Sequence, residues 1–238
     1  MVTILATDLD MTLVGDDDAL SKLNKQIEDL RGKQKLKLVY VTGRSYELYR
    51  ILEKEKKLLR PDSLITAVGT EIYDEVGQKV IGWPIVEDWN PVEIVKRLDN
   101  IKELIKQPES EQKQFKLSYY LENSHETFLL VKNILSDLSV DVLYSMNKYL
   151  DVLPRGINKG SALNYLAGLW RVEETNIITC GDSENDIGLL LIGKAIVVGN
   201  ANSALKDWAK KQIARNIYFA EAKCAGGINE GLAYYHIV

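Results

Sequence analysis

The stretch Thr3-Ile4-Leu5-Ala6-Thr7-Asp8-Leu9-Asp10-Met11-Thr12-Leu13 decides how the rest of this 238-residue chain is interpreted. It begins as an apolar run, which is typical of a strand buried on both faces. Asp8 and Asp10 follow at its carboxyl end, and an extended backbone would send both side chains to the same side. Two like charges aimed at one point need a cation or a shared proton. Because ligands of open α/β sheets bind beyond the carboxyl ends of the strands, the stretch predicts a binding site, the alternative being an acidic, solvated turn.

The composition argues against several kinds of partner. The chain has 30 basic and 34 acidic residues, a formal net charge of −4, which argues against nucleic acid and against an anionic membrane surface. No apolar stretch is long enough to cross a bilayer, and Asp8 comes too early for a signal peptide. We therefore expect a cytoplasmic protein with neither nucleic-acid nor membrane partners. Cys180 and Cys224 are expected to pack as small core residues, and the two histidines are too far apart in sequence to suggest a site.

The first third of the chain alternates between strand and helix patterns. Apolar spacing predicts a helix over 19–31, a strand over 36–41, a helix over 46–59 and a strand over 63–69 that continues through 70–73. This βαβαβ order indicates a parallel sheet.

The composition changes between residues 83 and 153, where polar residues are more frequent and strand patterns alternate. We expect, in order, a helix over 92–104, a half-buried strand over 115–121, a helix from Ser124 to Leu138, and a hairpin of 140–145 and 149–153. This order describes an α+β module with an antiparallel sheet.

The first pattern resumes after Pro154. The predicted elements are a helix over 158–170, a strand over 176–180, a strand over 195–199, a helix ending at Lys210, a short strand over 217–219 and a helix over 228–235. The sequence thus predicts an α/β fold. Its Rossmann-like parallel-sheet core, residues 1–82 and 154–238, has helices on both faces, and residues 83–153 form an inserted α+β cap domain.

Four polar segments stand at strand ends or helix starts of the predicted core. They are Asp8-Leu9-Asp10-Met11-Thr12, Thr42-Gly43-Arg44, Asn158-Lys159-Gly160 and Gly181-Asp182-Ser183-Glu184-Asn185-Asp186. Taken singly, Thr42-Gly43-Arg44 also fits a capped turn, and Lys159 fits a solvated helix-end lysine. A lysine at a helix N-terminus opposes the helix dipole, however, so a nearby anion makes better physical sense. Carboxylates brought to about 4 Å would repel by roughly 4 kcal/mol per pair, and an all-oxygen ligand set selects Mg²⁺ over Zn²⁺.

The order of these segments, with the insertion between the second and third, resembles the haloacid-dehalogenase-like superfamily of aspartate-nucleophile phosphatases. Within it, the chain is similar to cyanobacterial and plant sucrose-phosphate phosphatases in five stretches: Asp8 to Gly15, Thr42 to Ser45, Gly69 to Tyr73, Lys116 to Leu121 and Asp151 to Gly160. Thr70 departs from the serine expected in that family but keeps the hydroxyl group. The inserted module resembles the larger cap of the superfamily, which would choose the substrate.

The resemblance implies a role for each segment. Asp8 would be the nucleophile that forms an aspartyl-phosphate, and Asp10 the general acid and then base. The side chains of Asp8 and Asp182 and the backbone carbonyl of Asp10 would hold Mg²⁺. Asp186 and Asn185 would orient its water ligands. Thr42 and Lys159 would bind the transferring phosphoryl group. The expected substrate-binding residues are Thr42, Gly43, Arg44, Ser45, Gly69, Thr70, Glu71, Lys116, Ser118, Tyr119, Asn158 and Lys159. Strand alternation sends Tyr119 away from Lys116 and Ser118, so these residues cannot all face a sugar.

The activity that the resemblance implies is Mg²⁺-dependent hydrolysis of sucrose 6-phosphate to sucrose and phosphate, the last step of sucrose synthesis. Alternatives are a phosphatase for another sugar phosphate or for a glucosyl- or mannosyl-glycerate phosphate, a phosphomutase, and a non-catalytic module that binds a sugar-phosphate synthase. A pure binding module has no need of the Asp8 and Asp10 pair. We expect a monomer, and sucrose-phosphate synthase is the expected protein partner.

Overall fold

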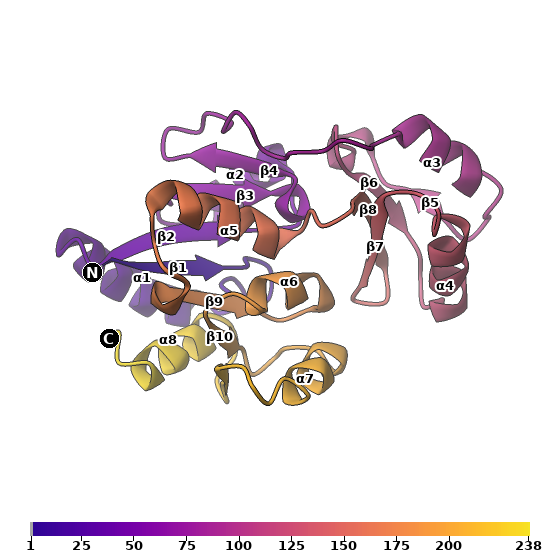
Figure 1. The fold of residues 1–238 in the computed structure, drawn as a ribbon. Helices are drawn as coiled ribbons and strands as arrows, with labels where there is room; N and C mark the ends of the chain where they lie inside the picture. Colours follow the sequence, from indigo (N-terminus) through magenta and orange to yellow (C-terminus); the bar gives the residue numbers. More distant parts are fainter. Residues whose placement is uncertain (1) are drawn as a thin grey trace.

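The computed structural model describes residues 2–238 and contains two β-sheets. Seven strands form the larger sheet, in the order β11-β10-β9-β1-β2-β3-β4, and four form the smaller sheet, in the order β5-β6-β8-β7. Figure 1 shows the two sheets side by side, joined by two chain crossings. We call the part around the larger sheet the core domain and the part around the smaller sheet, residues 91–154, the cap domain. The division of the chain at residues 83 and 153 stays a prediction.

The larger sheet is parallel except at one edge. Its parallel strands are β1 (Thr3–Thr7), β2 (Leu36–Val41), β3 (Ser63–Thr66), β9 (Ile177–Gly181), β10 (Lys194–Val197) and β11 (Ile217–Phe219). The edge strand β4 (Glu71–Asp74) pairs antiparallel to β3. The central strand β1 lies between β2 and β9, which explains its unbroken apolar run.

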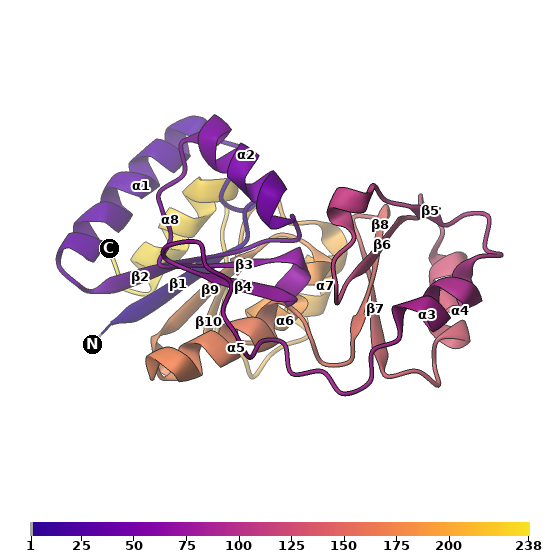
Figure 2. The same cartoon turned by 90° about the horizontal axis from the view of Figure 1, so that it is seen from above.

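Helices cover both faces of the larger sheet (Figure 2). On one face lie α1 (Asp17–Gly32), α2 (Tyr46–Lys56) and α8 (Cys224–Tyr234), whose apolar side chains share one hydrophobic cluster with α7 (Ser203–Lys210). On the other face lies α5 (Lys159–Trp170), which packs in a second cluster. The short helix α6 (Ile187–Leu190) follows β9. The predicted α/β core with helices on both faces is confirmed.

The cap domain has its own hydrophobic core. Its sheet is formed by β5 (Ile105–Lys106), β6 (Leu117–Tyr120), β7 (Val140–Ser145) and β8 (Tyr149–Pro154), all paired antiparallel. The helices α3 (Pro91–Leu98) and α4 (His125–Ile134) cover the face of this sheet that is turned away from the core domain (Figure 1). The face of the cap sheet that no helix covers is therefore turned toward the core domain.

Several predicted elements are wrong in detail. The strand expected over 63–73 breaks at Ala67–Gly69, where Ala67 and Val68 have positive φ, and the chain reverses into β4. The helix expected over 92–104 ends at Leu98, because the following residues lead into the edge strand β5. The last helix begins at Cys224 rather than residue 228.

In the part of the chain from residue 2 onward, every helix is too short or too polar to cross a lipid bilayer.

Candidate active site

Two neighbouring strands bring distant carboxylates together. The register of β1 and β9 pairs Thr7 with Cys180, so Asp8 and Asp182 follow at the same sheet edge. Carboxylate oxygens of Asp8, Asp182 and Asp186 lie within 4.8 Å of one another, and all three residues are buried. The side chain of Asp186 accepts hydrogen bonds from the backbone N–H of Asp182 at 3.0 Å and of Ser183 at 3.1 Å. The sequence prediction that the first and last acidic segments converge therefore holds.

Gly181, the last residue of β9, lies directly against the side chain of Asp186. A Cβ atom on Gly181 would lie 2.5 Å from the Cβ of Asp186. That approach is too close for any larger residue, so the glycine lets the carboxylate fold over the strand end.

Lys159 lies against two of these carboxylates. Its Nζ is 2.6 Å from Oδ1 of Asp8, 2.6 Å from Oδ1 of Asp186 and 3.0 Å from Oδ1 of Asn185, and the residue is fully buried. Asn158 caps the helix behind it by accepting from two backbone N–H groups of the first turn. The alternative reading of Lys159 as a solvated helix-end lysine is thus excluded by its position.

The cluster holds more negative than positive charge. Burial raises the pKa of Asp8 well above its usual range. The positive charge of Lys159 lowers this pKa, whereas the neighbouring carboxylates of Asp186 and Asp182 raise it further. Burial, together with Asp186, raises the pKa of Asp182 to about 7. Burial alone would lower the pKa of Lys159, but the carboxylates of Asp186 and Asp8 raise it above its ordinary value. One ammonium group does not neutralise three carboxylates, and this all-oxygen set could bind a metal ion of the hard, oxygen-preferring kind.

The raised pKa of Asp182 predicts a pH dependence of stability in the absence of metal. The pKa of its carboxyl group rises from 3.8 to about 7 on folding. Between these pH values the folded protein therefore binds more protons than the unfolded chain. Stability is therefore lost as the pH rises through this window, by up to about 4 kcal/mol. Urea unfolding in EDTA at about pH 5 and about pH 8 measures this loss for the wild type and for Asp182→Asn.

The variant should lose less stability than the wild type over the same interval, and Mg²⁺ should restore the wild type at the higher pH. Equal losses in both proteins would contradict the assignment.

Asp10 lies beside the cluster rather than inside it. Its two carboxylate oxygens each accept at 2.7 Å from the guanidinium of Arg44, from Nε and from Nη2. The side chain of Asp10 is 48% exposed. Thr42 is fully buried, and its hydroxyl accepts from the backbone N–H of Arg44 at 3.2 Å. Ser45 caps α2.

A cleft of about 600 Å³ lies between the acidic cluster and the cap sheet. The core domain contributes Asp8, Asp10, Gly43, Arg44, Asp182 and Asn185 to its walls. The cap domain contributes Gln107, Glu111, Lys116, Tyr120, Tyr149 and Asp151, among others. The cleft is therefore charged at both walls.

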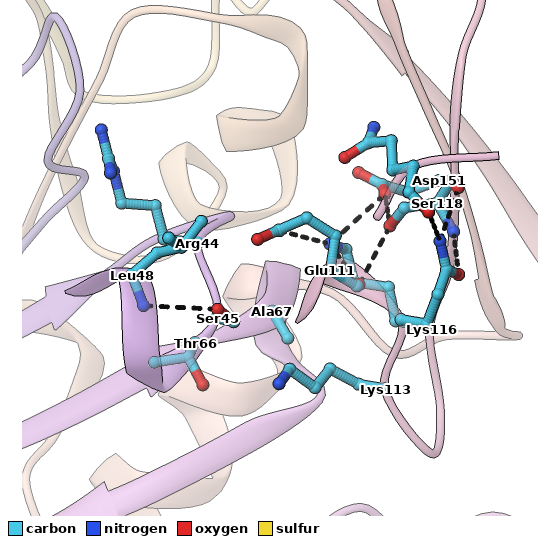
Figure 3. Close-up of polar contacts among 12 residues, drawn as sticks. Arg44, Ser45, Leu48, Thr66, Ala67, Glu111, Lys113, Lys116, Ser118 and Asp151 are labelled. Carbon is cyan, nitrogen blue, oxygen red and sulfur yellow. Dashed lines mark hydrogen bonds and ion pairs between the residues drawn. The ribbon is translucent and has the colours of Figure 1, made fainter. Parts of the chain in front are cut away.

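The cap wall holds a buried polar network (Figure 3). Nζ of Lys116 is 3.6 Å from Oε2 of Glu111 and 3.6 Å from Oδ1 of Asp151. Ser118 donates to Asp151 at 2.6 Å, across the β6–β8 pair in which the two residues face each other. The sequence reading predicted Lys116 and Ser118 but missed Glu111 and Asp151. A lone carboxylate inside the apolar strand Tyr149–Pro154 was a usable signal for Asp151.

Several predicted substrate-binding residues do not line this cleft. Tyr119 packs in the hydrophobic core of the cap, as strand alternation requires, so its assignment is corrected to packing. The carboxylate of Glu71 is held by Lys79 at 2.9 Å, and the hydroxyl of Thr70 donates to a backbone carbonyl at 3.0 Å. Gly69 lies under the start of α5, where a Cβ atom would come within 2.2 Å of the Asn158 carbonyl. These residues shape the loop that supports Lys159.

The fold and the site together define the class. A haloacid dehalogenase-like hydrolase from Bacillus subtilis matches 99% of this chain and 92% of its own with a TM-score of 0.70 at 20% identity, and a HAD subclass IIB sugar phosphatase matches all of both chains at 0.71 and 16%. The chain therefore has the fold of HAD-like hydrolases, with the acidic cluster at the strand ends. Residues 1–236 match the sucrose-6F-phosphate phosphohydrolase family, and the chain belongs to that family.

Individual relatives agree with this membership. The sucrose-phosphatase of Synechocystis sp. PCC6803, solved in complex with sucrose and phosphate, is 34% identical over 99% of both chains with a TM-score of 0.93. Sucrose-phosphatase 1 of Nicotiana tabacum is 33% identical over 98% of this chain. The chain spans about 60% of the length of the plant relatives. Mannosylfructose-phosphate phosphatase of Agrobacterium fabrum is 28% identical over 98% of this chain and 96% of its own.

Proposed function

We propose that this chain is a phosphoric monoester hydrolase that releases phosphate from sucrose 6-phosphate with the help of Mg²⁺. The observation that carries the proposal is the position of Asp8, which lines the cleft while Lys159 binds its Oδ1 at 2.6 Å. Family membership and the sucrose and phosphate bound to the Synechocystis relative support the substrate.

The side chains that line the cleft, with the buried Lys159 and Thr42 next to them, supply what the reaction needs. The carboxylate of Asp8 attacks phosphorus, and the bond from phosphorus to the sugar oxygen breaks. Asp10 gives its proton to that oxygen, then takes a proton from the water that hydrolyses the aspartyl-phosphate. Lys159 and Thr42 hold the phosphoryl oxygens, where negative charge grows in the transition state.

The acidic cluster fits Mg²⁺, because its donors are carboxylate oxygens that one lysine leaves partly unneutralised. Asp8 and Asp182 would hold the ion through their side chains and Asp10 through its backbone carbonyl. Asp186 and Asn185 would orient its water ligands. When bound, the ion supplies positive charge to the phosphoryl oxygens.

The cap network would bind the sugar. Lys116 donates, Asp151 accepts, and sugar hydroxyl groups can use both kinds of partner. Tyr120 and Tyr149 line the same cleft, with ring centroids 6.1 Å apart, and offer aromatic faces to the C–H bonds of a sugar ring.

A segment of a glucosylglycerol-phosphate synthase of Pseudomonas anguilliseptica is 29% identical over 98% of this chain, which supports a functional tie to a sugar-phosphate synthase such as sucrose-phosphate synthase. We propose a monomer that works in the cytoplasm, where the free, buried Cys180 and Cys224 stay reduced.

A phosphate-release panel tests the proposed function. With Mg²⁺, sucrose 6-phosphate should give a kcat/KM about tenfold or more above that of mannosylfructose phosphate, glucosylglycerol phosphate and glucose 6-phosphate, because only the right sugar satisfies the buried cap network. EDTA should abolish turnover. A better rate on mannosylfructose phosphate would move the assignment to the activity of the Agrobacterium relative. No release from any member would favour a binding module.

A further inference from the structure

The general acid proposed above has no free oxygen in this structure. Both oxygens of Asp10 accept from Arg44 at 2.7 Å in a two-pronged ion pair. A carboxyl group that donates a proton to a leaving oxygen must turn one oxygen toward it. Arg44 therefore has to move away from Asp10 before the sugar oxygen can be protonated.

Glu111 on the cap wall could provide a second binding position for the guanidinium of Arg44. Glu111 comes from the short helix Glu109–Glu111, and Lys116 approaches its Oε2 at 3.6 Å. Its other oxygen, Oε1, is buried and accepts no hydrogen bond from any described residue. A buried carboxylate oxygen without a donor is costly, so a free donor would be drawn to it.

Arg44 and Glu111 line the same cleft from opposite walls. In Figure 3 the carboxylate end of Glu111 is turned toward the core loop that carries Arg44 and Ser45. The negative charge of Glu111 also helps to hold the pKa of Arg44 above its usual range, after the larger effect of the hydrogen bond to Asp10. The charge of Glu111 thus already acts on Arg44 across the cleft.

We propose that Arg44 is a latch with two positions, bound to Asp10 in the structure described here and transferred to Oε1 of Glu111 when the cleft holds substrate. The inference rests on the proposed function and adds Glu111 as a positioning residue. The guanidinium keeps a carboxylate partner throughout, and the orphaned oxygen of Glu111 gains one.

The transfer gives Asp10 both of its tasks. Released from Arg44, the half-exposed carboxyl group of Asp10 can turn one oxygen toward the sugar oxygen and pass its proton to it as the bond to phosphorus breaks. The same carboxylate, now ionised, accepts a proton from the water that attacks the aspartyl-phosphate on Asp8. The proton count closes over one turnover.

A double-mutant cycle on kcat tests the latch. Glu111→Gln removes the second position and should lower kcat for sucrose 6-phosphate about tenfold or more, with KM changed by less than about threefold. In the Arg44→Gln background no latch remains, so adding Glu111→Gln should change kcat by less than about twofold. The matched control is Glu109→Gln in the same short helix, since the Glu109 side chain is 88% exposed and should leave both constants unchanged.

Other results would overturn the latch in recognisable ways. A rise in KM with kcat unchanged would make Glu111 a sugar-binding residue only, and additive effects of the two substitutions would show that Arg44 and Glu111 act separately. If the wild type releases phosphate from no substrate, the proposed function fails first. Should Glu111→Gln not fold, a structure of the wild type with orthovanadate and sucrose decides the matter. Arg44 should then contact Glu111, and an intact pair with Asp10 would refute the transfer.

Discussion

Replacing Asp8 with asparagine is expected to lower kcat about 10⁴-fold or more, because the amide cannot form an acyl phosphate and the nucleophile acts as one unit with its neighbours. The loss should be in kcat rather than in folding. Asp8 is buried against two other carboxylates, and its pKa is raised, first by burial. An uncharged amide of the same shape removes one of these repulsions, so thermal stability without metal should stay level or rise.

Phosphate release and thermal unfolding measure the two effects on the same protein. Asp207→Asn is the matched control, since the Asp207 side chain is 67% exposed on α7 and forms a loose pair with Lys210. It should leave both kcat and stability unchanged. Turnover by Asp8→Asn within about tenfold of the wild type would refute the nucleophile.

Lys159→Met is expected to damage both stability and activity. Lys159 is fully buried and binds Asp8 and Asp186 at 2.6 Å each, and among residues 2–238 no other ammonium group pairs with these two carboxylates, so its loss leaves them without a cation. Removing one partner from such a buried pair costs about 3–5 kcal/mol of unfolding free energy. Loss of a charge aimed at the phosphoryl group should lower kcat about 10²-fold to 10³-fold.

The loss of stability in Lys159→Met should depend on pH. Protons can replace the missing cation at about pH 5 but not at about pH 8. The variant should therefore lose more unfolding free energy at the higher pH. Mg²⁺ should recover part of the stability at the higher pH. Lys210→Met, at an exposed site, is the control. A loss in Lys159→Met no larger than in this control would contradict the buried network.

The floor of the site could be predicted from sequence because each part has a local signature. A buried strand is recognised by its apolar run. Asp8 and Asp182 each follow directly after such a run, so the end of each strand marks the position of its carboxylate. The parallel order then places the two ends at one sheet edge. The lysine at the start of α5 made sense only with an anion nearby, and the structure places Asp8 and Asp186 against it.

The cap wall was harder to predict, because its contacts join residues whose local patterns are ordinary. Glu111 lies in a polar connection that reads as solvated loop, and only tertiary packing buries its Oε1. Strand alternation did separate Tyr119 from Lys116, but no local rule says which face of the cap sheet meets the core domain. The reversal at Ala67–Gly69 was missed because two residues there take positive φ without being glycine.

Both chain crossings between the domains are anchored at one spot. The indole of Trp83, on the first crossing, donates to the carbonyl of Gly69 at 2.8 Å, and Gly69 in turn lies against Asn158, at the end of the second. We expect a cap segment whose ends meet in this way to be exchangeable between relatives. Transplanting residues 84–156 from a relative with another sugar preference should carry that preference over while the phosphoryl chemistry stays with the recipient.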